Sequence, residues 1–233
     1  MEIRIQQGLQ GLDRLQGAVV ILDIFRASNT IIALLEAGAA GVALIAGLEQ
    51  ARALKAEHPD WLLLGERKGL TPPGFEGGNS PVAARGMALK GRRVILTTSA
   101  GTQALPYLSP EVTPFYGSFA NAAALVGHLR RLDPPAVHLL PMGLEAKEPA
   151  REDDLAADYL ARLLAGERPD FSAYRQGLLH NDGAARLRRL GQHDDLEFCT
   201  SLDVSSLVPQ VKLTSPPWAV ALGVAAGERA HGG

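Results

Sequence analysis

The residues with the greatest chemical potential lie in a short turn between the apolar run at 18–22 and a helical pattern that follows it. Asp23 and Arg26 stand in this turn together with Ser28 and Asn29. A strand-to-helix turn needs about one capping side chain, so this number of polar groups is unusual. Arg26 could bind an anion in a fork geometry, assisted by helix amides, and Asp23 could serve a metal or a proton transfer. The alternative interpretation is a capped turn with a local Asp23–Arg26 ion pair.

Two later turns share this design, in which small polar residues separate a strand from a helix. They occupy 97–102 and 117–121, and a glycine-rich loop at 65–78 carries Glu66 and Arg67. Ligands of open α/β sheets bind beyond the carboxyl ends of strands, where unpaired helix amides suit phosphate, sulfate or carboxylate. One such turn is ordinary capping. Three of them, with Arg26 and this loop, favour an anion site, and the loop could close over a ligand.

Two further carboxylates, Glu152 and Asp153, open the clearest amphipathic helix of the chain. The helix dipole favours acidic residues in a first turn in any protein, which is the structural alternative. With Asp23 and Glu66 they could instead form an oxygen-rich site for Mg²⁺. The six histidines show no ligand spacing, so the sequence does not indicate zinc.

Several familiar catalytic motifs are absent. The sequence has no P-loop, no Gly-x-Gly-x-x-Gly turn and no Gly-x-Ser-x-Gly elbow. Cys199 has Ser205 six residues on, where the loop of a cysteine phosphatase needs Arg. Asp23 has Phe25 two residues on rather than a second Asp, which weakens an Asp-x-Asp mechanism.

The elements that must position these residues alternate regularly over the first 166 residues. Apolar runs predict strands at 2–6, 18–25, 41–45, 61–64, 93–97, 112–116 and 136–140. Helical patterns lie at 28–38 and 48–57, open at Pro81, end near Tyr107 and Leu132, and open again at Arg151. Later patterns predict helices at 172–180, 182–190 and 193–202 and a strand pair at 210–214 and 218–223. Alternation of this kind is typical of an α/β layered sheet.

Composition limits the possible class of protein. We expect one domain over 1–233, with strand–turn–helix units in 1–166 and a helical segment with a final strand pair in 167–233. The net charge of −2 gives no case for nucleic acid as a partner. No apolar run reaches the roughly 18–20 residues that cross a bilayer, and the N-terminal pattern is not that of a signal peptide. We therefore expect a cytoplasmic protein with no membrane partner, and its one cysteine excludes an internal disulfide framework.

Seven motifs in order resemble the 2-phosphosulfolactate phosphatase (ComB-like) family. They are Asp23-Ile24-Phe25-Arg26-Ala27-Ser28-Asn29-Thr30, Gly65-Glu66-Arg67, Pro73-Gly74-Phe75, Gly78-Asn79-Ser80-Pro81, Thr97-Thr98 with Gly101-Thr102, Gly117-Ser118 with Asn121-Ala122, and Glu152-Asp153. Each motif alone is weak, but seven in order are specific. The match covers about residues 18–160, and Cys199, Asp203 and Val208-Pro209 resemble the family's C-terminal pattern.

The resemblance implies a three-layer αβα fold with a mixed sheet, built from two similar α/β halves. It implies Mg²⁺-dependent hydrolysis of a phosphate ester on a small sulfonated hydroxy acid, and a homodimer. The candidate catalytic residues are Asp23, Arg26, Glu66 and Arg67, and the candidate Mg²⁺ ligands are Asp23, Glu152 and Asp153. The candidate substrate-binding residues are Ser28, Asn79, Ser80, Thr98, Ser99, Gly101, Thr102, Ser118 and Asn121.

The third motif departs from the family pattern. The family usually has Thr-Asn-Gly-Thr-Arg where this chain has Ser99-Ala100-Gly101-Thr102-Gln103, so an amide and a cation are lost. The competing hypothesis is therefore a non-catalytic anion- or metabolite-binding protein that retained the shape of the site. For an enzyme, a metal-activated water and a covalent aspartyl intermediate at Asp23 are both open.

Overall fold

A single mixed sheet of nine strands forms the centre of the computed structural model, which describes residues 1–213 and 219–225. The strand order is β1-β7-β2-β6-β8-β9-β3-β5-β4. The strands are β1 (Glu2–Ile5), β2 (Gly17–Leu22), β3 (Gly41–Leu44), β4 (Leu62–Gly65), β5 (Arg93–Thr97), β6 (Val112–Gly117), β7 (Ala136–Pro141), β8 (Leu207–Leu213) and β9 (Ala219–Ala225). All seven strands expected before residue 141 are present.

The sheet consists of two parallel blocks joined by an antiparallel strand pair. Strands β1, β7, β2 and β6 form one block, with Val20 opposite both Phe115 and Leu139. Strands β3, β5 and β4 form the other. Strands β8 and β9 lie between them and pair antiparallel with each other and with β6 and β3. The expected final strand pair is thus central in the sheet; positions 214 and 218 of that prediction lie outside the described residues.

Helices cover both faces of the sheet. The described helices are α1 (Ala27–Glu36), α2 (Leu48–Glu57), α3 (Pro81–Arg85), α4 (Ala122–Leu132), α5 (Arg151–Leu164), α6 (Phe171–Leu179), α7 (Asp182–Arg189) and α8 (His193–Cys199). In β3, Val42 and Leu44 pack in one cluster with α1, whereas Ala43 packs in another with α2. Since both faces of β2 and β3 are buried, their sequences are continuously apolar rather than alternating. The predicted three-layer αβα fold with a mixed sheet is confirmed.

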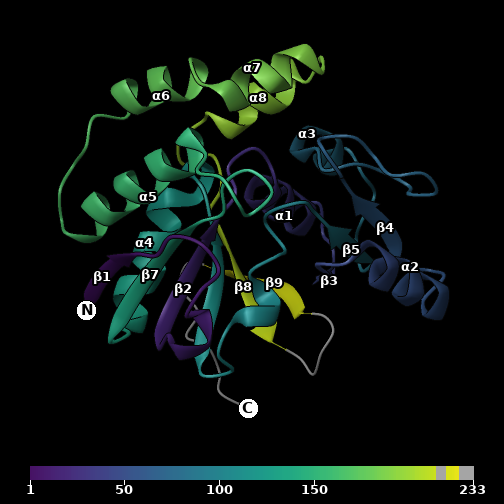
Figure 1. Cartoon of the computed structure of the whole chain (residues 1–233), viewed down its shortest axis with the longest axis horizontal. Helices are drawn as coiled ribbons and strands as arrows, with labels where there is room; N and C mark the ends of the chain where they lie inside the picture. The colour runs from purple at the N-terminus through teal and green to yellow at the C-terminus, as the bar shows by residue number, and fades with distance from the viewer. Residues whose placement is uncertain (214–218, 226–233) are drawn as a thin grey trace.

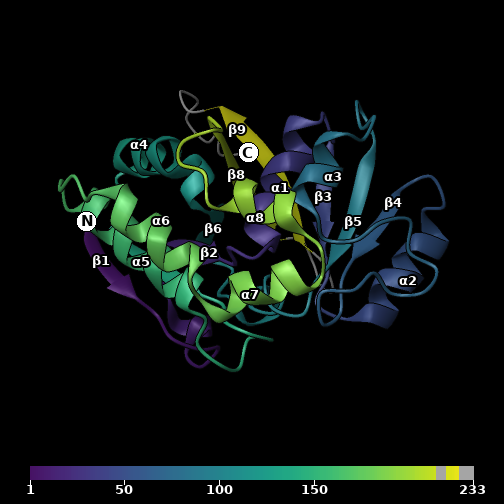
Figure 2. The ribbon, with the colours of Figure 1, turned by 90° about the horizontal axis from the view of Figure 1, so that it is seen from above.

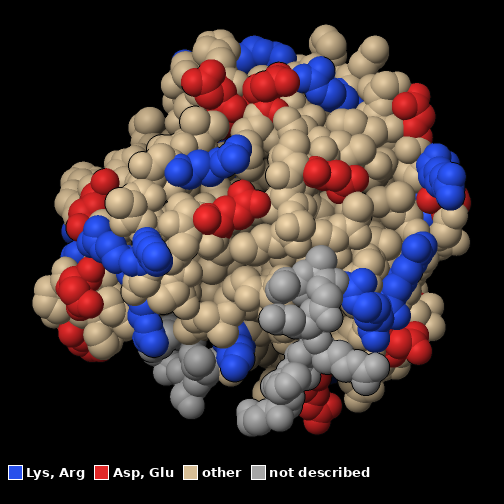
Figure 3. All heavy atoms as spheres, turned by 180° about the vertical axis from the view of Figure 1, so that it is seen from behind, with Lys and Arg blue, Asp and Glu red and all other residues tan. Residues whose placement is uncertain are grey.

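The helices after α5 form an outer layer across one end of the sheet. Helix α6 contacts α5, and α7 contacts both α5 and α8. Figure 1 shows α6, α7 and α8 above the sheet, and the view from above in Figure 2 places α7 between α5 on one side and α2 on the other. Seen from behind the view of Figure 1, basic and acidic side chains are interspersed over the surface (Figure 3).

Element boundaries differ from the predicted ones where polar turns begin. The strand predicted at 18–25 ends at Leu22, and the helix predicted at 28–38 is α1, because residues 23–26 form the connecting turn. The helix predicted to end near Tyr107 is a 3₁₀ turn at Leu105–Tyr107, and α8 ends at Cys199 rather than at 202. None of the described helices is long and apolar enough to cross a membrane. The single domain over 1–233 and the homodimer stay predictions.

The buried core predicts a large difference between two leucine truncations. Leu96 of β5 is fully buried, whereas Leu70 is 61% exposed. We expect Leu96→Ala to lower the free energy of unfolding by about 2–5 kcal/mol, because it leaves a cavity. Leu70→Ala should change it by less than about 0.5 kcal/mol. Urea titration followed by circular dichroism measures both, and equal effects would contradict this packing.

Candidate active site

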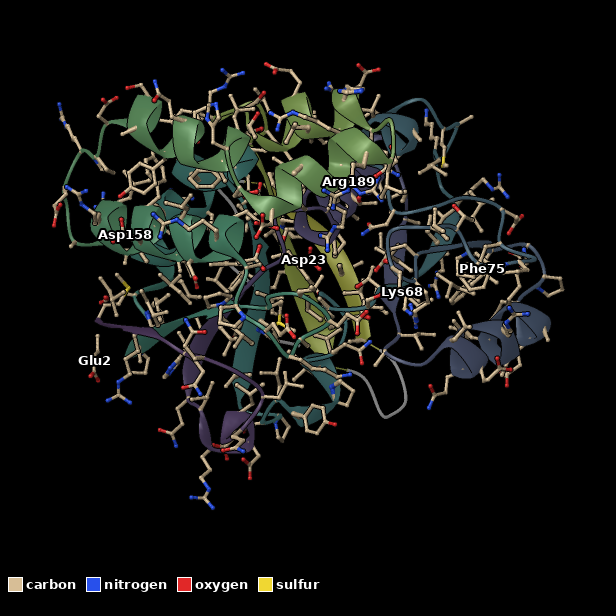
Figure 4. The ribbon with its side chains drawn as sticks, turned by 45° about the horizontal axis from the view of Figure 1, so that its top comes forward. Glu2, Asp23, Lys68, Phe75, Asp158 and Arg189 are labelled. Carbon is tan, nitrogen blue, oxygen red and sulfur yellow. The ribbon has the colours of Figure 1, made fainter. Side chains whose placement is uncertain are left out.

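A cavity of about 610 Å³ opens where the turn after β2 meets the segment after β4, the β7–α5 connection and α7. Asp23 and Arg26 line it from the first segment, and Glu66 lines it from the second. Glu152 and Asp153 line it from the start of α5. Figure 4 shows the labelled Asp23, Lys68 and Arg189, which reach this cavity from three different segments. One cavity thus holds carboxylates that are far apart in sequence, such as Asp23 and Asp153.

Asp23 is held rigidly in the turn after β2. Its Oδ1 accepts a hydrogen bond from the Ala27 amide at 3.2 Å, and its own amide donates to Ser28 Oγ at 3.0 Å. Ser28 in turn donates to the Ile21 carbonyl at 3.3 Å. A Cβ on Gly101 would lie 2.8 Å from Asp23 Oδ2, so only glycine fits there. Ser28 and Gly101 therefore shape the position of Asp23 and do not line the cavity.

Glu66 is fixed by the segments around it. Its carboxylate accepts from the Ser99 amide at 2.6 Å, from Ser99 Oγ at 3.2 Å and from the Gly69 amide at 2.8 Å. These bonds join the end of β4 to the turn after β5. Ser99 and Asn79 also line the cavity, and the buried Oδ1 of Asn79 has no hydrogen-bond partner among the described residues.

Asp153 ties the start of α5 to the turn after β2. One carboxylate oxygen accepts from the Ile24 amide and the other from the Gly143 amide, both at 2.8 Å. Its neighbour Glu152 lies against α7, since a Cβ on Gly183 would be 2.3 Å from Glu152 Oε1. The two acids serve different contacts: Asp153 bonds backbone amides, while Glu152 faces another helix.

Three buried acids repel one another where water is largely excluded: Asp23, Glu152 and Asp153. Burial, opposed by the Ala27 amide and reinforced by Glu66 and Glu152, raises the pKa of Asp23 from 3.8 to about 6. Burial and then the charges of Asp23 and Glu152 raise the pKa of Asp153 well above its ordinary value. Burial also raises the pKa of Glu152, opposed by Arg186. A site of this kind favours a proton or a cation.

The donor set suits Mg²⁺ chemically, because every acid supplies hard oxygen ligands. Within 1–213 and 219–225, no three His, Cys, Asp or Glu side chains converge closely enough to enclose a metal. Mg²⁺ commonly takes only one or two carboxylates and completes its shell with waters and substrate oxygens. Asp23 and Glu152 fit that role better than Asp153, whose two oxygens already accept amides.

Arg26 has a buried partner that the sequence did not reveal. Its Nη1 lies 2.6 Å from Asp195 Oδ2 of α8, and both side chains are 4% exposed. The other Asp195 oxygen accepts from Ser80 Oγ at 2.6 Å and from the Val82 amide at 3.2 Å. The ion pair that the alternative interpretation placed between Asp23 and Arg26 therefore joins Arg26 to Asp195 instead. The C-terminal helices are thereby attached to the first motif.

Other candidate residues hold the turns rather than line the cavity. Arg67 donates to the carbonyls of Glu66 and Ala46 and to Thr97 Oγ1, at 2.6, 3.1 and 2.8 Å. Residues that bond within their own turn or cap a helix are Ser80, Thr98, Thr102, Ser118 and Asn121. Gln103, at the departure from the family pattern, donates to the Ala46 and Thr98 carbonyls at 2.9 and 2.8 Å.

Sequence reasoning placed Arg26 at the site but missed other basic residues of the cavity. Lys68 lines it next to Glu66, and Arg186 and Arg189 line it from α7. Their chemical type was the only feature that could have indicated a role. The sequence around a short helix does not show which of its faces will contact a distant loop.

Fold and site together define an α/β protein in which buried acids and basic side chains line one cavity. A family model described as 2-phosphosulpholactate phosphatase matches residues 4–214, and the chain belongs to this family. The predicted family is confirmed. The chain is 34% identical to a "Probable 2-phosphosulfolactate phosphatase" of Carboxydothermus hydrogenoformans, over 83% of this chain and 85% of the relative. Proteins with the same description match from Deinococcus radiodurans (34% identical, 82% and 85% covered) and Thermotoga maritima (31%, 82% and 87%).

The buried ion pair makes a first prediction for the site. We expect Asp195→Ala to lower the free energy of unfolding by about 3–5 kcal/mol, because Arg26 is left buried and unpaired. The matched control is Glu197→Ala on the same helix, whose ion pair with Arg175 is exposed and should cost less than about 1 kcal/mol. Urea titration compares the two, and similar losses would contradict the role of Asp195.

The raised pKa of Asp23 makes a second prediction. The folded state binds this proton more tightly than the unfolded state does, so its stabilisation is present below pH 3.8 and is lost as the pH rises through about 6. In EDTA, Asp23→Asn should therefore gain about 2–3 kcal/mol of unfolding free energy over the parent protein between roughly pH 4.5 and 8. The exposed control Asp13→Asn should show no such gain. A difference between Asp23→Asn and the parent that does not change with pH would contradict the assignment.

Proposed function

We propose that this protein hydrolyses the phosphate ester of a small anionic hydroxy acid, with 2-phosphosulfolactate as its substrate and Mg²⁺ as its cofactor. The observation that carries the proposal is the buried carboxylate cluster around Asp23, which shares one cavity with Lys68, Arg186 and Arg189. Family membership supports the substrate, since the relatives carry that activity in their descriptions.

Asp23 is the reacting carboxylate in this proposal. With a pKa of about 6, it is largely deprotonated at neutral pH and still basic enough to accept a proton. It can take the proton of an attacking water, or it can attack phosphorus itself. In the second route the P–O bond to the hydroxy acid breaks, the released oxygen takes a proton from water, and a water molecule then hydrolyses the aspartyl phosphate. Both routes need the same carboxylate at the same place, and the fixed Ala27 and Ser28 contacts keep it there.

The other residues support this step. A bound Mg²⁺ would neutralise charge on the phosphate oxygens, and Asp23 and Glu152 are the residues that would hold it. Glu66 orients the Ser99 amide and hydroxyl, which line the cavity and can donate to a phosphate oxygen once the substrate displaces part of their present bonding. Arg26, neutralised by Asp195, positions the turn rather than supplying a free charge.

Phosphate release from 2-phosphosulfolactate tests the proposal. We expect release that requires Mg²⁺ and stops in EDTA, and we expect Asp23→Asn to lower kcat by at least about 100-fold. The exposed Asp13→Asn is the matched control and should keep the parent rate.

Two outcomes would count against the proposal. Full activity of Asp23→Asn would remove this carboxylate from the reaction. No Mg²⁺-dependent release from 2-phosphosulfolactate, phospholactate or p-nitrophenyl phosphate would favour the non-catalytic anion-binding alternative.

A further inference from the structure

The face of α7 that lines the cavity carries two arginines. Asp182, Arg186 and Arg189 follow helical spacing and line the cavity, whereas Arg188 points elsewhere and donates to the Leu179 carbonyl at 2.8 Å. The helix is anchored by Leu187, which is 2% exposed. These arginines therefore project from a packed helix, Arg186 half-buried and Arg189 exposed.

The cationic groups here differ from Arg26, which is neutralised by Asp195. Among the described residues, no carboxylate oxygen lies within 4.0 Å of the side-chain nitrogens of Lys68, Arg186 or Arg189. Acidic residues share the same cavity, yet none of these cations forms a direct ion pair with them; the charge of Arg186 acts on the pKa of Glu152 without such a contact. Their charge is available to a ligand.

Asn181, the residue that caps α7, adds an unused donor. Its Oδ1 accepts from the Ala184 amide at 2.8 Å, which fixes the orientation of the side chain. Its Nδ2 is buried and has no hydrogen-bond partner in the described part of the chain, and the residue lines the cavity. A buried donor without a partner is costly, so a ligand oxygen that accepts from it would stabilise the complex.

From these contacts we propose that Lys68, Asn181, Arg186 and Arg189 form a subsite for the sulfonate of the substrate, separate from the phosphate beside Asp23. This inference rests on the proposed function. A sulfonate remains ionised and has three acceptor oxygens, which suits two guanidinium groups, an ammonium and an amide. Glu152 lies against Gly183, one turn before Arg186, so the subsite adjoins the acidic cluster. A short substrate can therefore reach both.

Two esters that differ only at the proposed group provide the test. 2-Phosphosulfolactate carries a sulfomethyl group where 2-phospholactate has a methyl group, so the two differ only by the sulfonate. For Arg186→Gln and Arg189→Gln, we expect KM for phosphosulfolactate to rise about 10- to 100-fold. The preference in kcat/KM for phosphosulfolactate over phospholactate should fall by a similar factor, and Arg186→Lys should recover part of it.

Arg188→Gln is the matched control, since it removes the same charge from the same helix outside the cavity. It should leave the preference unchanged, and thermal melting of each variant verifies that it is folded. An equal loss on both esters would assign the arginines to the phosphate or the carboxylate, which both esters carry. No loss on either ester would mean that the arginines do not bind the substrate. Both results overturn the subsite.

A binding measurement separates this inference from the proposed function. If the parent protein hydrolyses neither ester, the proposed function fails, and calorimetry with sulfolactate and lactate still tests the subsite. We then expect the parent to bind sulfolactate more tightly than lactate, and Arg186→Gln to lose that difference. Equal binding of sulfolactate and lactate by the parent protein would overturn the subsite.

Discussion

The burial of several carboxylates in one place is the constraint on which the rest of this structure depends. Backbone amides, not counter-charges, satisfy Asp153 through Ile24 and Gly143 and support Asp23 through Ala27. Amides satisfy hydrogen bonds but do not cancel charge, so the mutual repulsion remains. That repulsion favours the binding of a proton or a cation at the cluster. The cluster also requires three separate segments of the chain to be held in fixed positions around it.

The two parallel blocks and the C-terminal helices meet this requirement together. The turn after β2 belongs to one block, and the segments after β4 and β5 belong to the other. Asp195 then joins α8 to Arg26 and, through Ser80, to the start of α3. The helices that follow α5 therefore do more than cover the sheet: they complete the wall of the cavity that faces the acids.

The strand–turn–helix order could be predicted because buried strands are continuously apolar and polar turns separate them from helices. Asp23, Glu66 and Ser99 could be placed for the same reason, since Asp23 and Glu66 directly follow strands and Ser99 lies in the turn after β5. Ser28 and Thr102 could not be told from ligand-binding residues in the sequence. A small polar residue that hydrogen-bonds within its own turn is of the same type as one that binds a ligand. Only the fold separates these uses.

Other parts of the site have no local signal. Asp195 pairs with a residue 169 positions away, and in sequence it is one more acid in a first helical turn. Which face of α7 lines the cavity, and which carbonyls Gln103 binds, likewise depend on contacts with distant segments. The resemblance identified the family and its motifs. The roles that it implied for Arg67, Ser118 and Asn121 do not follow from the structure, because these residues are not among those that line the cavity.

The central claim is that the acids around Asp23 form a cation site beside a bound anion. A crystal structure with Mn²⁺ in place of Mg²⁺ and with sulfolactate, read from the anomalous signal of manganese, tests it most directly. We expect manganese at Asp23 or Glu152 and the sulfonate against Arg186 and Arg189. Manganese and sulfolactate bound outside this cavity, or a cavity that stays free of both at saturating concentrations, would contradict the account.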